Sequence, residues 1–218
     1  GASGLYDRST IVSGVFDLSL ENGDSSKPYR YVPMFSPTEA ALVTPGASID
    51  YVNAHRTDER PLEQLPLSRR RLSFTARLAH RFDASTLRAE ERLYYDSWQM
   101  AASTTDVRWI FDLGKRFALW PHVRFHAQKA VNFWQLAYVS NSTTGWDLPE
   151  YRTGDRELGP LTTVLGGGGL KWFLGSDPEP RSYALSLQLD AGYTAYTDDL
   201  YVSNRTMVLS TLRFEGEL

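Results

Sequence analysis

The chain has 218 residues, enough for one large or two small domains. With 42% hydrophobic and 22% charged residues, its composition is that of a folded protein and not of a disordered one. Its formal charge of -3 gives no basic excess for nucleic acid, and its lack of cysteine excludes disulfides, a thiolate nucleophile and a cysteine-bound metal centre. No stretch approaches the roughly 18 apolar residues of a membrane-spanning helix and no basic-then-apolar leader precedes the first residue, so a helical membrane protein is not expected.

Residues 11–21 and 68–82 are the first two predicted strands, with a long connection between them that begins as residues 21–46. In the second strand, SRRRLSFTARLAHRF, leucine and arginine occur side by side. A helix would spread the apolar residues around its circumference, because helical neighbours recur at three and four residues, whereas a strand separates the two kinds at period two. One side then carries Leu72, Phe74, Ala76 and Leu78, and the other carries Arg71, Ser73, Thr75 and Arg77.

Residues 86–98 and 106–113 repeat this alternation. The polar side of residues 86–98 alternates in the sign of its charge, as in a salt-bridged ladder, and Glu91 is the exception on the apolar side. In the first segment Leu87, Ala89, Leu93 and Tyr95 lie opposite Arg88, Glu90, Arg92, Tyr94 and Asp96; in the second, Val107, Trp109 and Phe111 lie opposite Asp106 and Arg108.

Residues 116–128 and 182–197 continue the pattern, and residues 206–215 are a less regular last strand. The first of these places Phe125 with other apolar residues opposite His122, Arg124 and His126; the second places Leu185, Leu187 and Leu189 opposite Ser186, Gln188 and Asp190.

The length of these strands is what selects the fold. Strands of globular proteins usually have about 5 or 6 residues, whereas a tilted strand needs about 9 to 11 to cross a bilayer. Short connections at residues 81–86 and 113–116 contrast with long ones at residues 21–46 and 140–160, which is typical of outer-membrane barrels. We therefore predict an all-β, antiparallel transmembrane β-barrel, or part of a larger one, as a single domain over residues 1–218.

Other patterns have simpler explanations than catalysis or cofactor binding. His122 and His126 would lie about 13 Å apart on a strand, too far for one metal ion. The run Gly166–Gly169 lacks the lysine and hydroxyl of a phosphate-binding loop and indicates a strand bend or bulge. Asp190 and the pair at 198–199 match no calcium loop. No GxSxG or comparable signature occurs, so we expect no enzyme, cofactor or metal.

The charged side of the strands is the candidate functional surface, because neighbouring strands would place it along one lumen wall. Such a wall either screens anionic solutes or fills itself with ion pairs. The lumen-lining candidates are Arg71, Arg77, Arg88, Glu90, Arg92, Asp96, Arg108, His122, Arg124 and His126; the lipid-facing candidates are Leu72, Phe74, Leu78, Trp109, Phe111, Phe125, Leu185, Leu187 and Leu189.

Several spaced motifs occur in order within residues 28–175. Their residues are Tyr94, Tyr95, Asp96 and Trp98; Gln128, Ala130, Phe133 and Trp134; and Tyr151, Arg152, Asp155, Arg156 and Leu158. Together these motifs resemble the bacterial envelope family known as domain of unknown function 3570. The resemblance implies an outer-membrane β-barrel of unestablished function. It also implies that the chain corresponds to the C-terminal half of longer members, which would leave an N-terminal barrel segment as a partner.

Three functions remain open from the sequence. The first is a non-enzymatic, porin-like outer-membrane barrel of a Gram-negative envelope, acting as a pore, an export conduit or a scaffold for other envelope proteins, with lipid and lipopolysaccharide as its surroundings. The second is an outer-membrane enzyme that modifies lipid at the barrel rim. The third is a soluble β-barrel that binds an amphipathic ligand. Nucleic acid is not an expected partner.

Overall fold

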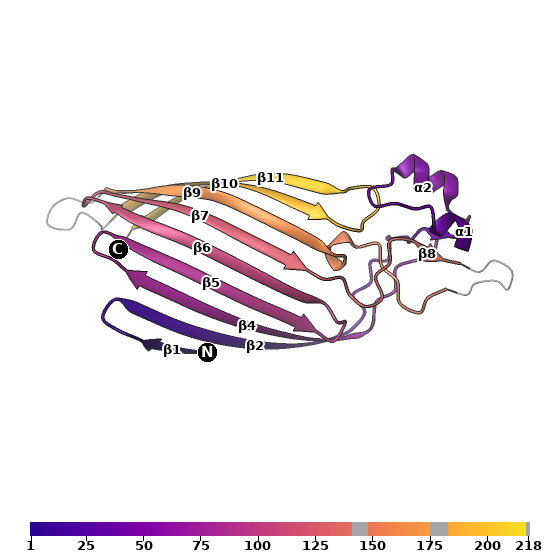
Figure 1. Ribbon diagram of the computed structural model, residues 1–218, viewed down its shortest axis with the longest axis horizontal. Coiled ribbons are helices and arrows are strands. Elements are labelled where there is room, and N and C mark those ends of the chain that lie inside the picture. The colour runs from indigo at the N-terminus through magenta and orange to yellow at the C-terminus, as the bar shows by residue number, and fades with distance from the viewer. Residues whose placement is uncertain (141–147, 175–182, 217–218) are drawn as a thin grey trace.

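The computed structural model describes residues 1–140, 148–174 and 183–216, and its main feature is a nine-stranded antiparallel sheet (Figure 1). The order is β1-β2-β4-β5-β6-β7-β9-β10-β11, so strands that follow one another along the chain are also neighbours in space. The strands are β1 (Ala2–Leu5), β2 (Thr10–Asn22), β4 (Ser68–Arg81), β5 (Ser85–Asp96), β6 (Ala101–Leu113), β7 (Phe117–Gln128), β9 (Leu161–Phe173), β10 (Tyr183–Tyr196) and β11 (Asn204–Gly216).

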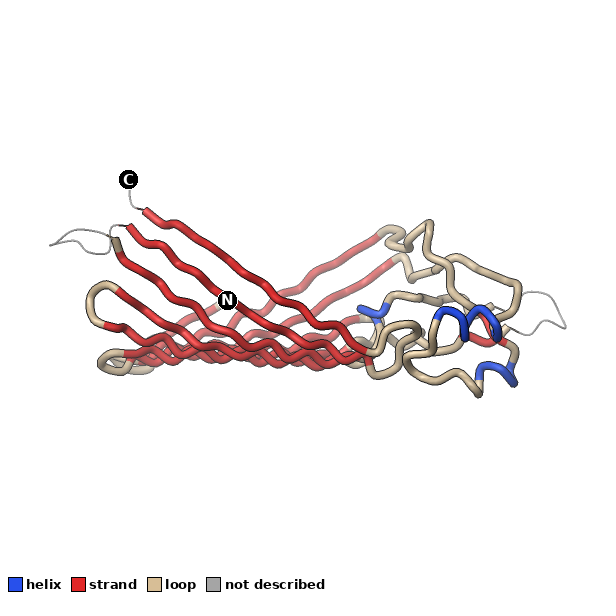
Figure 2. Tube along the Cα trace, turned by 90° about the horizontal axis from the view of Figure 1, so that it is seen from above, coloured by secondary structure: helices blue, strands red, loops and turns tan. Residues whose placement is uncertain are grey.

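The long strands expected from the alternation are therefore present, but the sheet is not closed by hydrogen bonds into a barrel. Figure 2 shows that the sheet is curled, with the strands near its two edges rising on the same side of the middle strands. At one end the strands are joined by short turns, such as residues 82–84 and 114–116. We call this the turn end and the opposite one the cap end.

The strand registers place the two kinds of side chain on opposite faces of the whole sheet. Arg77, Glu90 and Asp106 are directly opposite one another across β4, β5 and β6, while Leu78 is opposite Ala89. We call the face that carries Arg77 the inner face and the face that carries Leu78 the outer face. Burial is reversed relative to a water-soluble sheet: Leu187 on the outer face is 47% exposed, whereas polar Thr75 on the inner face is 4% exposed.

The glycine run lies in the middle of β9, where the sequence predicted a strand bend or bulge without giving the bounds of the strand. The predicted bulge is wrong, because Gly166–Gly169 pair without a break with β7 on one side and β10 on the other. The glycines instead make room for neighbouring side chains. A Cβ atom on Gly169 would lie 2.2 Å from the ring of Trp120.

A compact group of loops at the cap end, which we call the cap, is built from the described parts of residues 23–67, 129–160 and 197–203 (Figure 1). Residues 141–147 of the second long connection lie outside the described residues. The cap contains β3 (Met34–Phe35), which pairs in parallel with β8 (Tyr138–Val139), and the helices α1 (Pro37–Ala40), α2 (Ile49–His55) and η1 (Arg156–Leu158).

Local signals explain the two α-helices of the cap. Ser36 and Ser48 are their N-caps, and each side chain accepts a hydrogen bond from a backbone N–H three residues later. The cap has two small buried clusters, one with Phe35 and Val52 and the other with Tyr138, and these three residues are at most 2% exposed. None of the helices in the described part of the chain is long and apolar enough to cross a membrane.

Candidate functional site

The inner face of β4 to β7 brings together every residue predicted to line a lumen. The registers put all ten on this face, Arg71 and Arg77 from β4, Arg88, Glu90, Arg92 and Asp96 from β5, Arg108 from β6, and His122, Arg124 and His126 from β7. The nine predicted lipid-facing residues lie on the outer face of β4, β6, β7 and β10. That the ten inner-face residues contact water and the nine outer-face residues contact lipid remains a prediction.

Ion pairs between neighbouring strands neutralise part of the inner face. Arg77 pairs with Glu90, and Arg71 Nη1 lies 2.9 Å from Glu21 Oε1. These side chains are 38% to 52% exposed, and such pairs typically contribute only about 0–1 kcal/mol each. They therefore set the charge pattern of the face more than they stabilise the sheet.

His122 belongs to a second, more buried arrangement near the middle of the sheet. Its Nδ1 lies 3.4 Å from Asp190 Oδ1, and the two side chains are 5% and 9% exposed. The other carboxylate oxygen of Asp190 accepts a hydrogen bond from Gln188 at 2.7 Å. Gly167 lies between His122 and Asp190 in the registers, so its missing side chain lets the two approach each other.

Replacing Gly167 by alanine is expected to destabilise the sheet by about 1–3 kcal/mol, the usual cost of overpacking. Its Cβ atom would lie 2.2 Å from both Asp190 Oδ1 and the backbone oxygen of Leu189, and backbone cannot easily move aside. The control is Gly166→Ala, whose nearest atom would be 4.0 Å away. Equilibrium unfolding in detergent compares the two, and equal stabilities would contradict the packing role of Gly167.

His126 and the remaining acidic candidates are engaged separately. His126 Nδ1 lies 2.8 Å from the Thr104 hydroxyl oxygen. Asp199 lies in the cap, whereas Asp190 lies on β10, so the structure does not bring these two carboxylates together. Within the described residues no group of three or more His, Cys, Asp or Glu side chains could hold a metal ion.

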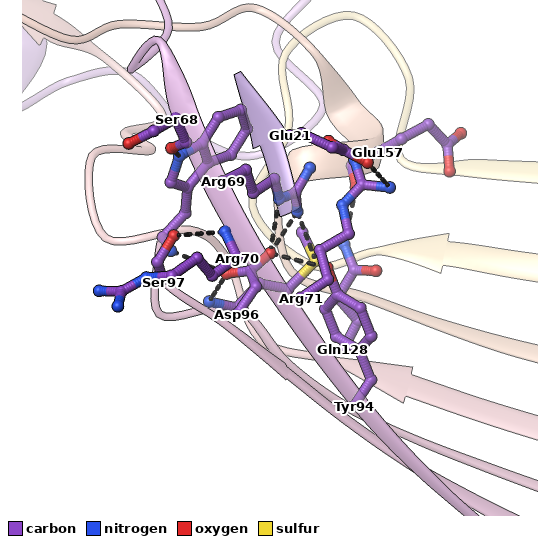
Figure 3. Close-up of polar contacts among 12 residues, drawn as sticks. Glu21, Ser68, Arg69, Arg70, Arg71, Tyr94, Asp96, Ser97, Gln128 and Glu157 are labelled. Carbon is purple, nitrogen blue, oxygen red and sulfur yellow. Dashed lines mark hydrogen bonds and ion pairs between the residues drawn. The ribbon is translucent and has the colours of Figure 1, made fainter. Parts of the chain in front are cut away.

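A buried ion pair, which the sequence did not predict, lies at the cap end of the inner face. Figure 3 shows Arg69, Tyr94 and Asp96 converging on one another. Asp96 Oδ2 accepts a 2.8 Å hydrogen bond from Arg69 Nε and another from the Tyr94 hydroxyl, while Oδ1 accepts from the backbone N–H groups of Trp98 and Met100. Asp96 is only 1% exposed, so it is a buried anchor and does not present its charge to the space above the sheet.

A protein family matches nearly the whole chain, residues 1–215, and its description is "Protein of unknown function (DUF3570)". The chain belongs to this family. No curated protein and no solved structure matches the chain. Family membership therefore carries no established activity to these residues.

The sequence motifs that resemble the DUF3570 family meet at the junction between sheet and cap. Trp98 and Phe133 pack edge to face with ring centroids 5.6 Å apart, and the guanidinium of Arg69 lies 4.1 Å from the Trp98 ring centroid. Gln128 donates to the backbone oxygens of Glu157 and Gly159. This junction core contains Leu65, Trp98, Met100 and Val131, with Tyr94, Phe133, Trp134 and Leu158 packed against it.

Asp199 gives the cap a pH-dependent contribution to stability, because burial raises its pKa from 3.8 to about 6. The folded cap binds this proton more tightly than the unfolded chain, so the contribution is favourable at low pH and is lost as the pH rises through about 4 to 6. Asp199→Asn should therefore raise the thermal midpoint at about pH 7.5 and leave it unchanged near about pH 4. A midpoint difference independent of pH would contradict this assignment.

Proposed function

We propose that the chain forms most of the wall of a transmembrane β-barrel in a bacterial outer membrane, and that it acts as a non-enzymatic pore or export conduit with a polar inner face. The observation that carries the proposal is the reversed burial of the sheet. Leu189, Val123 and Leu212 are 54%, 49% and 71% exposed on the outer face of three different strands. Large exposed apolar patches are rare on soluble monomers, whereas lipid is the natural solvent for them.

The dimensions of the sheet support this proposal. The strands β4 to β7 and β9 to β11 have 12 to 14 residues, enough for the roughly 9 to 11 that a tilted transmembrane strand needs. Glu91, the acidic exception on the outer face, accepts a 2.6 Å hydrogen bond from Ser103 and another from Thr105. These two hydrogen bonds partly compensate the charge of Glu91 on a face where an unpaired carboxylate in contact with lipid would be costly.

Aromatic side chains gather toward the turn end of the outer face, as in the interfacial belts of membrane barrels. Phe117 stacks on Trp172 across β7 and β9, and Tyr183 stacks near Phe214 across β10 and β11. Trp109 stacks on Phe111 within β6 and also contacts Phe82, the residue after β4. The set consists of Phe82, Trp109, Phe111, Phe117, Trp172, Tyr183 and Phe214.

Closure of the barrel has to give a partner to both edges of the sheet, because unpaired backbone groups at a sheet edge cannot remain exposed to lipid. Among the described residues, β11 has no partner beyond β10, and β1 covers only residues 11–14 of β2. The nine strands alternate in direction, so β1 and β11 run the same way. An antiparallel closure between β11 and β1 therefore takes an odd number of additional strands, supplied by another stretch of polypeptide or by a partner protein, whereas the part of β2 that β1 leaves uncovered runs antiparallel to β11 and needs none.

Extraction of native membranes with alkaline carbonate tests the proposal. Membranes are taken from a bacterium that makes the full-length protein, and the outer-membrane fraction is probed with an antibody against the cap. Retention together with a known outer-membrane barrel is the expected result. Release together with a soluble periplasmic marker would overturn the assignment of the outer face to lipid.

A further inference from the structure

Two arginine side chains on the inner face are adjacent and lack a counter-ion among the described residues. Arg88 of β5 and Arg108 of β6 are directly opposite each other in the register. The next residues in the same row are Ala79 of β4 and His122 of β7, neither of which is a carboxylate. No described carboxylate forms an ion pair with either guanidinium.

The nearest acidic residues do not remove this excess of positive charge. Glu90 and Asp106 form the adjacent row, but Glu90 is already paired with Arg77. Asp106 is directly opposite Arg124 on its other side. Like charges opposite each other destabilise a sheet, so the pair Arg88 and Arg108 carries a cost that a bound anion would relieve.

The space above this pair can hold a small ligand. A recess of about 450 Å³ is lined by Arg77, Arg88, Arg108, the hydroxyl-bearing Ser13 and the two carboxylates of the acidic row. Its volume falls within the range of about 300–1,000 Å³ that is usual for small-molecule sites. Three cationic side chains, two carboxylates and a hydroxyl therefore face one recess, and one of the carboxylates, Glu90, is paired with Arg77.

We propose that this recess is a binding site for a phosphate-class dianion, held by Arg88 and Arg108. Guanidinium groups donate two parallel hydrogen bonds to phosphate oxygens, and a dianion neutralises both positive charges whereas chloride or a carboxylate neutralises one. The inference extends the proposed function by naming the solute class that the inner face would recognise, and it rests on that function only in requiring the inner face to be in contact with water.

Equilibrium dialysis with radiolabelled inorganic phosphate tests this site on the full-length protein purified in dodecyl maltoside. Saturable binding is expected for the wild type, and the double substitution Arg88→Gln, Arg108→Gln should weaken it by about tenfold or more, since hydrogen bonds to charged groups are among the strongest. The matched control is Arg92→Gln, on the same strand and face but outside the recess. It should change binding by less than about twofold.

A second arm separates free phosphate from a lipid headgroup. The same variants are compared in micelles containing phosphatidic acid, a lipid whose phosphomonoester headgroup can carry two negative charges, and bound phospholipid is quantified after purification. Saturable uptake of either phosphate source that the double substitution removes supports the site and identifies its source. No uptake by folded wild-type protein, or equal uptake by the double variant, overturns the site. Neither failure affects the carbonate test, which reports on the outer face alone.

Discussion

Leu187→Arg is expected to lower the free energy of unfolding of the membrane-inserted protein by about 2–4 kcal/mol, the cost of a basic side chain near the middle of the lipid-facing band of a barrel. Leu187 is on the outer face of β10, 47% exposed, and is directly opposite Leu170 and Leu212. No carboxylate stands beside it in this row. The arginine would have to reach the interface or remain uncompensated in hydrocarbon.

Gln188→Arg is the matched control, because the next residue of β10 points to the inner face. Gln188 donates to Asp190 there, and an arginine would find that carboxylate nearby. Reversible urea unfolding from lipid vesicles, followed by gel mobility, should show a change of less than about 1 kcal/mol for this variant. If the outer face were in water, Leu187→Arg would instead change stability by no more than about 0.5 kcal/mol.

The alternation of residue types could predict the strands and their faces because both follow from local geometry. A strand turns successive side chains to opposite sides, so the period-two pattern in residues 68–82 already separated Leu72 and Phe74 from Arg71 and Arg77. The registers of β4 and β5 then bring these faces together as expected. Barrel closure could not be predicted from the alternation, because the pattern within each strand does not show whether the last strand pairs with the first.

The bounds and the two faces of β9 were not predicted, for a physical reason that the structure makes clear. Its four glycines carry no side chain to mark a face, so the alternation is hidden although Val164, Leu170 and Trp172 do share the outer face. The signal available was this spacing of the three apolar residues on both sides of the run. The glycines make room for the Trp120 ring of β7 and the Asp190 carboxylate of β10. This role could not be inferred without the strand order.

The cap junction could not be predicted from the sequence because its parts are far apart in the chain. Arg69, Asp96 and Phe133 come from three different segments, and only folding places them together. The motifs that resemble the family contained Asp96 and Trp98, but strand alternation assigned Asp96 to the lumen wall. In the structure Asp96 is buried, and this burial depends on packing between segments that are far apart in the chain.

Asp96→Ala is expected to be the most destabilising single substitution at this junction, at about 3–5 kcal/mol, which is typical when one partner of a buried ion pair is removed. The guanidinium of Arg69 would lose its counter-ion, and the backbone N–H groups of Trp98 and Met100 would lose the acceptor that now satisfies them. Asp96→Asn keeps an oxygen for those N–H groups but loses the charge, so its stability should lie between those of the wild type and the alanine variant.

Glu90→Ala is the matched control, because Glu90 is on the same strand and face and also pairs with an arginine. Its carboxylate is 38% exposed, compared with 0% for the Asp96 side chain, so its loss should cost only about 0–1 kcal/mol. Chemical unfolding with tryptophan fluorescence measures both variants, because Trp98 packs directly on Arg69. Equal losses at the two positions would mean that the buried pair contributes no more than an exposed one. A large loss confined to Asp96 would show that this contact anchors the turn between β5 and β6, whose Trp98 and Met100 pack against the cap residues Leu65 and Val131.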